Sequence, residues 1–155
     1  MSPVTRLATP DDAEELTRLR RLMFESMGVD VDATPWEAAC VSFFRRRLGV
    51  DDVVGVVVDA PRGSGLASSG VIELAERIPG PRSPSGRSGY ISTISTDPHY
   101  QRQGLARAVM DALVSLASAR GLDHVELHAT EQGRRIYEKL GFVDRPGSPS
   151  MSLFL

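Results

Sequence analysis

The stretch YISTISTDPHYQRQGLARAVMDALVSLA, residues 90–117, changes pattern midway and decides the fold that we predict. Residues 90–96 are rich in β-branched and aromatic side chains and predict a strand, which Asp97-Pro98 ends because proline has no N–H to donate. From Leu105 onward, apolar residues recur at helical spacing, so a long helix is expected to begin near Gly104. The first N–H groups of a helix lack partners inside it and favour an anion. We therefore predict a strand that leads into a phosphate-binding loop.

The loop between this strand and this helix has the residue types that a polyphosphate needs. Gly104 and Ala106 are small enough to let a polyphosphate approach the backbone. Arg102 and Arg107 flank them and can pair with phosphate oxygens. A lone glycine loop would still be only weak support for a phosphate site, because glycine is common in ordinary turns.

Two motifs together resemble one known family. Gln101-x-x-Gly104-x-Ala106, between a strand and a helix, resembles the acyl-CoA pyrophosphate loop of the GNAT acetyltransferase superfamily. Further along, residues 136–142 (IYEKLGF) resemble the tyrosine-bearing helix and Gly-Phe exit of the same family. The resemblance implies an α/β fold, with a mixed, mostly antiparallel twisted sheet and helices on both of its faces. It also implies a splay between strands 90–96 and 122–129 that holds acetyl-CoA.

The resemblance implies a reaction and a set of site residues. The reaction is direct attack of a primary amine, from a small molecule or a peptide, on acetyl-CoA in a ternary complex. Tyr137 matches the position that in many family members donates a proton to the CoA sulfur; a tyrosine satisfied by a backbone partner is the alternative. No metal is implied. The implied cofactor contacts are Ile94, Ser95, Thr96, Arg102, Gln103, Gly104, Leu105, Ala106 and Arg107.

The general base and the acceptor contacts are less defined by the sequence. Strand 90–96 has no carboxylate, so the glutamate that some family members place there is absent. The remaining candidates for a base are Glu73, Glu126 and His128. Candidate acceptor contacts lie in a connection that borders the acceptor in similar enzymes, where solvated acids and a buried tryptophan are an equally good explanation; they are Asp30, Asp32 and Trp36.

The rest of the chain predicts elements that fit one domain over residues 1–155. The pattern predicts short strand 4–7, helices near 10–27 and 35–48, a hairpin of strands 53–59 and 66–74, helix 131–140 and a closing strand 151–155. Residues 77–89 are rich in proline, glycine and serine and predict an exposed, mobile loop, either a lid over the acceptor site or a passive insertion.

Composition limits the function classes. A net charge of −2 gives no electrostatic reason to expect nucleic acid, and no apolar run is long enough to cross a bilayer. The single cysteine, Cys40, excludes an internal disulfide and fits a cytoplasmic protein. Dimers are common among similar proteins, so a homodimer is considered, although the sequence shows no interface.

The sequence leaves two alternatives to an enzyme of this family to be compared. A non-catalytic acyl-CoA-binding or regulatory module could use the same fold, because fold alone does not prove turnover. A nucleotide-binding protein is disfavoured because Gln101-x-x-Gly104-x-Ala106 lacks the lysine and hydroxyl pair of a P-loop.

Overall fold

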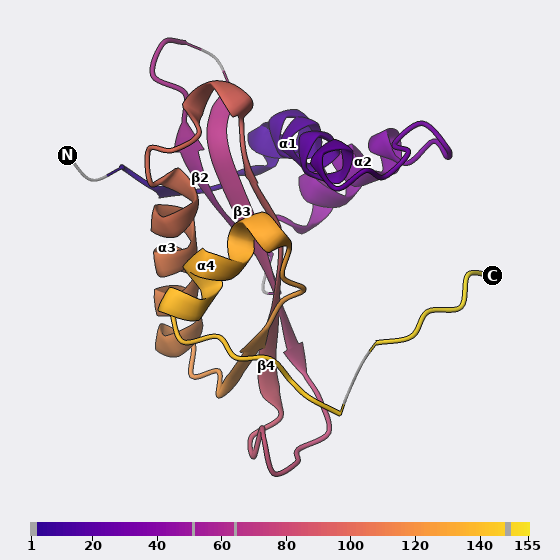
Figure 1. Cartoon of the computed structure of the whole chain (residues 1–155), viewed down its shortest axis with the longest axis vertical. Helices are drawn as coiled ribbons and strands as arrows, with labels where there is room; N and C mark the ends of the chain where they lie inside the picture. The colour runs from indigo at the N-terminus through magenta and orange to yellow at the C-terminus, as the bar shows by residue number, and fades with distance from the viewer. Residues whose placement is uncertain (1–2, 51, 64, 148–149) are drawn as a thin grey trace.

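The computed structural model of the protein describes residues 3–50, 52–63, 65–147 and 150–155. Its centre is a five-stranded sheet with strand order β1-β2-β3-β4-β5 (Figure 1). Neighbouring strands are antiparallel except β4 and β5, which run parallel. The expected mixed, mostly antiparallel sheet is confirmed. The strands span Arg6–Leu7, Val53–Asp59, Leu66–Glu76, Arg87–Thr96 and His124–Glu126.

Helices cover both faces of the sheet, as predicted. α1 (Ala13–Ser26) and α2 (Glu37–Arg47) pack on one face, and α3 (Leu105–Ala119) and α4 (Glu131–Lys139) pack on the other (Figure 1). Short 3-10 turns precede α1 at Pro10–Asp12 and α3 at Pro98–Tyr100, and the second is labelled η2 below. Among the described residues, no helix combines the length and apolar character that a membrane span requires.

The valine-rich strand β2 shows why the core has two halves. Successive side chains of a strand point to opposite faces, so a strand buried on both faces is apolar throughout. Val54 and Val56 pack with α3 residues such as Val109, whereas Val53 and Val57 pack in a cluster with α1 and α2. β2 is therefore buried on both faces, and the sheet divides the core into an α3 side and an α1–α2 side.

The C-terminal end of the fold differs from the prediction. β5 covers only His124–Glu126, which is shorter than the predicted strand 122–129. Residues 151–155 form no strand and are exposed, so the prediction of a closing strand is wrong for this structure. A strand exists only where a neighbour hydrogen-bonds to it, and within the described part of the chain β5 has no neighbour beyond β4.

The loop between β3 and β4 is shorter than predicted. β3 continues to Glu76 and pairs there with Arg87, where β4 begins. The loop is attached to the body because Asp123 accepts hydrogen bonds from the Ser83 hydroxyl and from the Ser85 backbone N–H (2.8 Å). It lies at the opposite end of β4 from the predicted phosphate-binding loop (Figure 1).

Candidate functional site

The site is built where β4 and β5 separate. Their parallel pairing begins at Ser88 and His124 and ends at Tyr90 and Glu126, after which β4 continues to Thr96 without β5 beside it. A cavity of about 780 Å³ lies at this divergence. Its walls are β4 residues 90–96, the segment 127–132, part of α1, and Tyr137 of α4. The predicted splay between the two strands is therefore present.

A bulge bends β4 along the cavity. The β3–β4 register shifts between Ser69 and Val71, opposite Thr93, whose backbone φ is +58°. A β-branched residue rarely adopts positive φ, so the surrounding contacts must hold it there. The Arg20 guanidinium donates to Thr93 Oγ1 (2.6 Å), and the Ser69 hydroxyl donates to the Thr93 carbonyl (3.2 Å). The bulge turns this part of β4 toward the cavity, as bulges commonly do near active sites.

The predicted phosphate-binding loop has the expected geometry. Gly104 is the N-cap of α3 with φ +76°, a left-handed conformation that glycine adopts without strain. A Cβ at this position would meet nothing within 4 Å, so the protein leaves open space above the start of the helix. The first N–H groups of α3 face that space without intrahelical partners. Arg102 is exposed, and Arg107 pairs with Asp111 (3.3 Å) on the next turn of α3.

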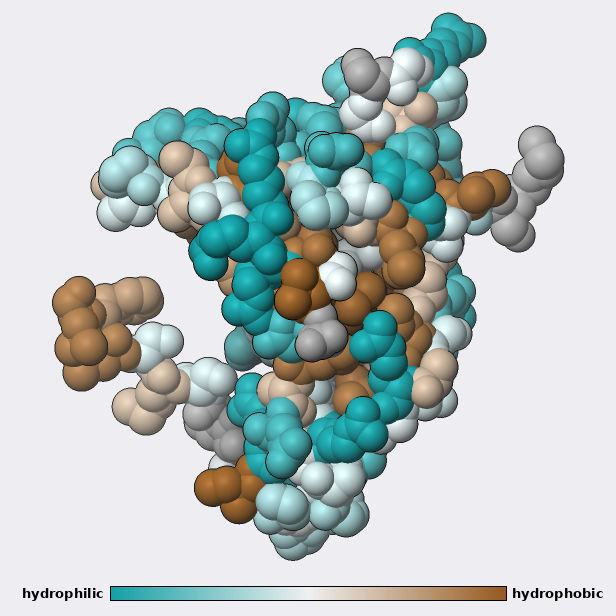
Figure 2. All heavy atoms as spheres, turned by 180° about the vertical axis from the view of Figure 1, so that it is seen from behind, coloured by the Kyte–Doolittle hydropathy of each residue, from teal (hydrophilic) through white to brown (hydrophobic). Residues whose placement is uncertain are grey.

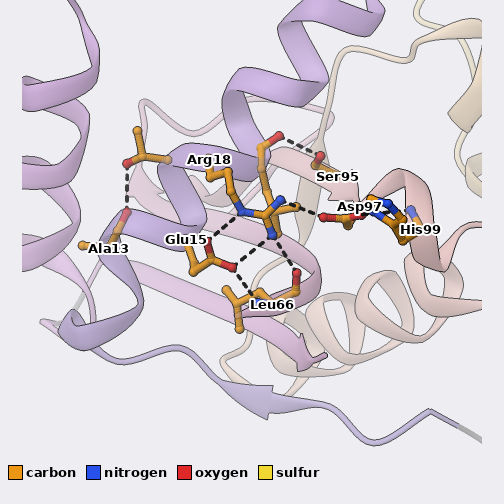
Figure 3. Close-up of polar contacts among 9 residues, drawn as sticks. Ala13, Glu15, Arg18, Leu66, Ser95, Asp97 and His99 are labelled. Atoms are coloured by element: carbon orange, nitrogen blue, oxygen red, sulfur yellow. Dashed lines mark hydrogen bonds and ion pairs between the residues drawn. The ribbon is translucent and has the colours of Figure 1, made fainter. Parts of the chain in front are cut away.

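A polar network ties this loop to α1 and to the sheet (Figure 3). The Arg18 guanidinium donates to Asp97 (2.7 Å), to Glu15 (2.7 Å) and to the Leu66 carbonyl (3.1 Å). The other oxygen of Asp97 accepts the His99 backbone N–H (2.9 Å) and so caps η2. Asp97 thus caps a short helical turn, and Arg18 adds a long-range partner to it.

The electrostatics of Asp97 follow from these contacts. Burial acts to raise the pKa of its carboxyl group, because a charge is poorly solvated there. Hydrogen bonds from the His99 backbone and the Arg18 guanidinium outweigh burial and hold the pKa at about 2. Asp97 is therefore a carboxylate at neutral pH, and its charge holds the turn that leads into the predicted phosphate-binding loop.

Tyr137 is buried, with 6% of its surface exposed, and its ring packs against Phe142 in the α3-side core. Its ring also lies against Gly133, where any Cβ would approach the Tyr137 hydroxyl to 2.6 Å. The hydroxyl makes no hydrogen bond to another described residue, and Tyr137 lines the cavity. Burial raises the pKa of the phenol, which keeps its proton in place.

The base candidates divide into two groups. Glu73 and His128 line the cavity, whereas Glu126 faces away from it and pairs with Arg145 (2.7 Å). His128 Nδ1 lies 2.7 Å from the Tyr90 hydroxyl, across the gap between β4 and the segment that follows β5. Glu73 is an exposed residue of β3, opposite Tyr90 of β4. Of the three candidates, two thus line the cavity.

The predicted acceptor contacts Asp30, Asp32 and Trp36 do not line the cavity. Asp32 pairs with Arg21 (3.0 Å), and the Asp30 carboxylate accepts the Asp32 backbone N–H (3.1 Å). The Trp36 indole donates to the Val31 carbonyl (2.9 Å) and its ring meets Phe24 edge-on. These contacts stabilise the connection between α1 and α2, and Trp36 is half-buried there rather than fully buried.

The sequence analysis missed Arg20 and Tyr90 as cavity residues. The Arg20 guanidinium stacks over the Phe24 ring at 4.7 Å and, among the described lining residues, is the one permanent cation. Arg20 lies on the cavity wall beside Thr93, and the hydrogen bond between them joins residues that are far apart in sequence. No local pattern in α1 could have identified it.

Comparisons with known proteins agree with this geometry. Residues 64–151 match the family model described as an acetyltransferase (GNAT) domain. The glucosamine 6-phosphate N-acetyltransferase of Trypanosoma brucei brucei is 30% identical over 106 residues, which make up 68% of this chain and 68% of that protein. A mycothiol acetyltransferase of Beutenbergia cavernae is 37% identical over 63 residues, or 39% of this chain and 21% of that protein.

A solved structure shows the same fold. A protein of Clostridium acetobutylicum, described as a predicted acetyltransferase with acetyl-CoA, superposes with a TM-score of 0.85 at 22% identity. The superposition covers 97% of this chain and 96% of that one. The similarity therefore extends over the whole arrangement of sheet and helices that forms the cavity.

Proposed function

Because the chain belongs to the GNAT acetyltransferase family, we propose that it transfers the acetyl group of acetyl-CoA to the primary amine of a small molecule, by direct attack in a ternary complex. Its enzyme class is that of an acetyl-CoA-dependent N-acetyltransferase. Beyond this enzyme class, we propose the class of acceptor, the direct mechanism and the roles of individual residues. The observation that carries them is one cavity that joins the bulged strand β4 to Tyr137 and opens toward the loop before α3.

Acetyl-CoA fits this site through backbone groups. Its pyrophosphate would lie on the first N–H groups of α3, beside Arg102 and Arg107. Its pantetheine arm would run along residues 94–96, where β4 has lost its β5 neighbour and its backbone groups on that side are free to pair. A β4 N–H aimed at the thioester oxygen would stabilise the negative charge that develops during attack.

The reaction needs a proton donor and a proton acceptor. The amine nitrogen attacks the thioester carbonyl carbon, the carbon–sulfur bond breaks, and the departing sulfur takes a proton. Tyr137 is the proposed donor, because its hydroxyl is protonated, reaches the cavity and is committed to no other described residue. The proton of the amine passes to Glu73 or His128, directly or through water.

Arg20 supports an acceptor that has an anionic group near its amine. Thr93 and Phe24 hold the Arg20 guanidinium on the cavity wall with most of its donors still available. The relative from Trypanosoma brucei brucei is named for glucosamine 6-phosphate, which combines an amine with a phosphate. We propose an acceptor of this kind, with its anion at Arg20 and its amine toward the thioester.

The decisive experiment measures thiol release from acetyl-CoA across a panel of amines. Tyr137→Phe removes only the hydroxyl, and loss of a general acid is expected to lower kcat on the order of 100-fold while acetyl-CoA still binds. Tyr100→Phe is the matched control, because Tyr100 lies in η2 outside the cavity lining. Equal kcat for Tyr137→Phe and wild type would contradict the acid role.

The acceptor class is tested with glucosamine and glucosamine 6-phosphate, which share the amine and differ in the anion. Wild type is expected to favour the phosphorylated amine in kcat/KM, and Arg20→Met to lose about tenfold of that preference, since one charged hydrogen bond contributes about 1.5–3 kcal/mol. Met keeps the apolar length of the side chain over Phe24. A preference that survives the substitution would exclude Arg20 as the anion contact.

Two further features belong to the proposal. The enzyme is proposed to act in the cytoplasm, in keeping with its single cysteine, and as a homodimer, since dimers are common among similar proteins. The alternative of a catalytically silent acyl-CoA-binding module predicts acetyl-CoA binding without thiol release for any amine in the panel. The same experiment therefore separates the two functions.

A further inference from the structure

Tyr90 and His128 form a close polar pair at the point where β4 and β5 separate. Tyr90 is the last β4 residue in register with β5, and its partner there is Glu126. His128 lies two residues further along, where the chain has left the sheet. The Tyr90 hydroxyl and His128 Nδ1 are 2.7 Å apart, and the two rings meet edge-on with their centres 5.6 Å apart. One hydrogen bond between side chains therefore bridges the two sides of the splay.

The surroundings of the pair favour one placement of its protons. Tyr90 is half-buried, and burial raises the pKa of its phenol, which therefore keeps its proton at neutral pH. A protonated phenol donates to an imidazole nitrogen that carries no hydrogen, so Nδ1 of His128 is the acceptor and Nε2 carries the imidazole proton. Nε2 lies 3.4 Å from the Ser150 hydroxyl. Residues 151–155 are exposed and stand apart from the body of the protein (Figure 2), so they leave this side of the imidazole open.

Tyr90 is also placed to meet the acceptor, since both members of the pair line the cavity. With the pantetheine arm along residues 94–96, the thioester would lie toward the bulge at Thr93, and Tyr90 lies beyond it, away from the phosphate-binding loop. The positive charge of Arg20, the proposed contact for the acceptor's anion, acts on the Tyr90 phenol. A hydroxyl has one hydrogen and two lone pairs, so Tyr90 can accept a hydrogen bond from an amine while it donates to His128.

We propose that the Tyr90 hydroxyl takes the proton of the attacking amine and passes its own proton to Nδ1 of His128. As the neutral amine nitrogen bonds to the thioester carbon, its N–H bond breaks and an O–H bond forms at Tyr90. The original O–H bond of Tyr90 breaks in the same step, and an N–H bond forms at Nδ1. His128 becomes an imidazolium and releases its proton to water after turnover. This inference rests on the proposed acetyl transfer and selects His128 over Glu73 as the final acceptor of the proton.

The charges around the pair favour this direction of transfer. Glu73 of β3 and Glu126 of β5 are both in register with Tyr90, and the negative charges of both carboxylates act on its phenol. Nearby negative charge stabilises an imidazolium. Of the two base candidates in the cavity, His128 is the one that the Tyr90 hydroxyl reaches, and Glu73 contributes negative charge beside it.

The first experiment measures thiol release from acetyl-CoA with glucosamine 6-phosphate as the amine. Tyr90→Phe keeps the ring that meets His128 and removes the hydroxyl, so kcat is expected to fall about 100-fold, at the lower end of the range for general base catalysis. Acetyl-CoA binding, measured by calorimetric titration, is expected to be unchanged. Tyr100→Phe, outside the cavity lining, is the matched control and is expected to keep the wild-type kcat.

A second set of variants tests whether Tyr90 and His128 act as one unit. His128→Ala changes an exposed side chain, so the fold is expected to persist, and kcat is expected to fall as far as in Tyr90→Phe. The double variant is expected to lose no more than either single variant, because groups that act in one step are not additive. Free imidazole is expected to restore thiol release in His128→Ala and not in the double variant. A purely structural role for His128 would give no such rescue.

Glu73→Gln tests the competing base. It is expected to lower kcat only a few-fold, on the order expected for one neighbouring charge, and Tyr90→Phe is expected to cause its full loss in that background as well. A loss of about 100-fold in Glu73→Gln, with kcat near wild type in Tyr90→Phe, would make Glu73 the base and overturn the inference.

The outcomes separate this inference from the proposed function. A wild-type protein that binds acetyl-CoA but releases no thiol with any amine of the panel overturns both. Thiol release by wild type that Tyr90→Phe retains at the same kcat overturns the proton relay alone. A loss in Tyr90→Phe that is not matched by a loss in His128→Ala also overturns the relay, because the proton then goes elsewhere.

Discussion

The loop between β4 and α3 and the tail after Ser150 are both extended segments, yet one is held and the other is free. The loop is capped by Asp97, turned by Gly104 and connected to α1 through Arg18, so its contacts lie within the same chain. The tail has strand-like alternation but, within the described part of the protein, pairs with no strand of the sheet. Short-range contacts and one ion pair are thus enough to fix the conformation of the predicted phosphate-binding loop, whereas a strand needs a second strand.

The largest expected effect comes from forcing the loop out of its conformation. Gly104→Val places a β-branched residue at φ +76°, where L-residues pay roughly 1–2 kcal/mol. We expect acetyl-CoA binding to weaken about tenfold or more, measured by calorimetric titration. Gly104→Asn is the control, because asparagine tolerates this conformation and no protein atom crowds the position. If Val and Asn weaken binding equally, the added side chain matters and the backbone conformation does not.

The next effect tests the long-range anchor of the loop. Asp97→Asn removes the charge that Arg18 and the His99 N–H stabilise, and it should lower the free energy of unfolding at pH 7 by about 2 kcal/mol, as measured in urea. It should also raise KM for acetyl-CoA more than it lowers kcat. Glu25→Gln removes an exposed ion pair with Arg21 and is expected to change stability by less than about 0.5 kcal/mol.

The pH dependence of this anchor has a defined sign. The pKa of Asp97 is about 2 in the folded protein against 3.8 for the unperturbed group. Its contribution to stability is therefore complete above pH about 4 and is lost as pH falls toward 2. The stability difference between wild type and Asp97→Asn should be constant from neutral pH to about pH 5 and shrink below pH 4. A difference that grows on acidification would show that the charge is not what stabilises the loop.

The smallest expected effect is on the tail within one protomer. Leu153→Ser changes a side chain that is 84% exposed, so the free energy of unfolding should change by less than about 0.5 kcal/mol. Urea unfolding of both proteins measures this difference. A loss of stability as large as that expected for Asp97→Asn would contradict the exposed position of residue 153.

The helices, the hairpin and the cofactor loop could be predicted because their signals are local. Asp97-Pro98 and Gly104 fix the ends of β4 and α3 through backbone chemistry, and the valines of β2 indicate burial on both faces. The cavity wall could be predicted only in part. Tyr137 could be predicted as a site residue because it lies in a recognisable motif. Arg20 could not be predicted, because its partner Thr93 lies 73 residues away in sequence.

By itself, the sequence determined the order of most elements and the position of the loop before α3, because short-range backbone preferences and apolar periodicity specify these. The α/β class came from the two motifs that resemble the GNAT family. Only the tertiary structure decided which titratable side chains reach the cavity, since Glu73 and His128 meet there while Asp30 and Asp32 do not. The tertiary structure also decided that residues 151–155 lie outside the sheet. Whether a strand forms depends on a hydrogen-bonding partner, and a sequence pattern cannot place that partner in its own chain or in another.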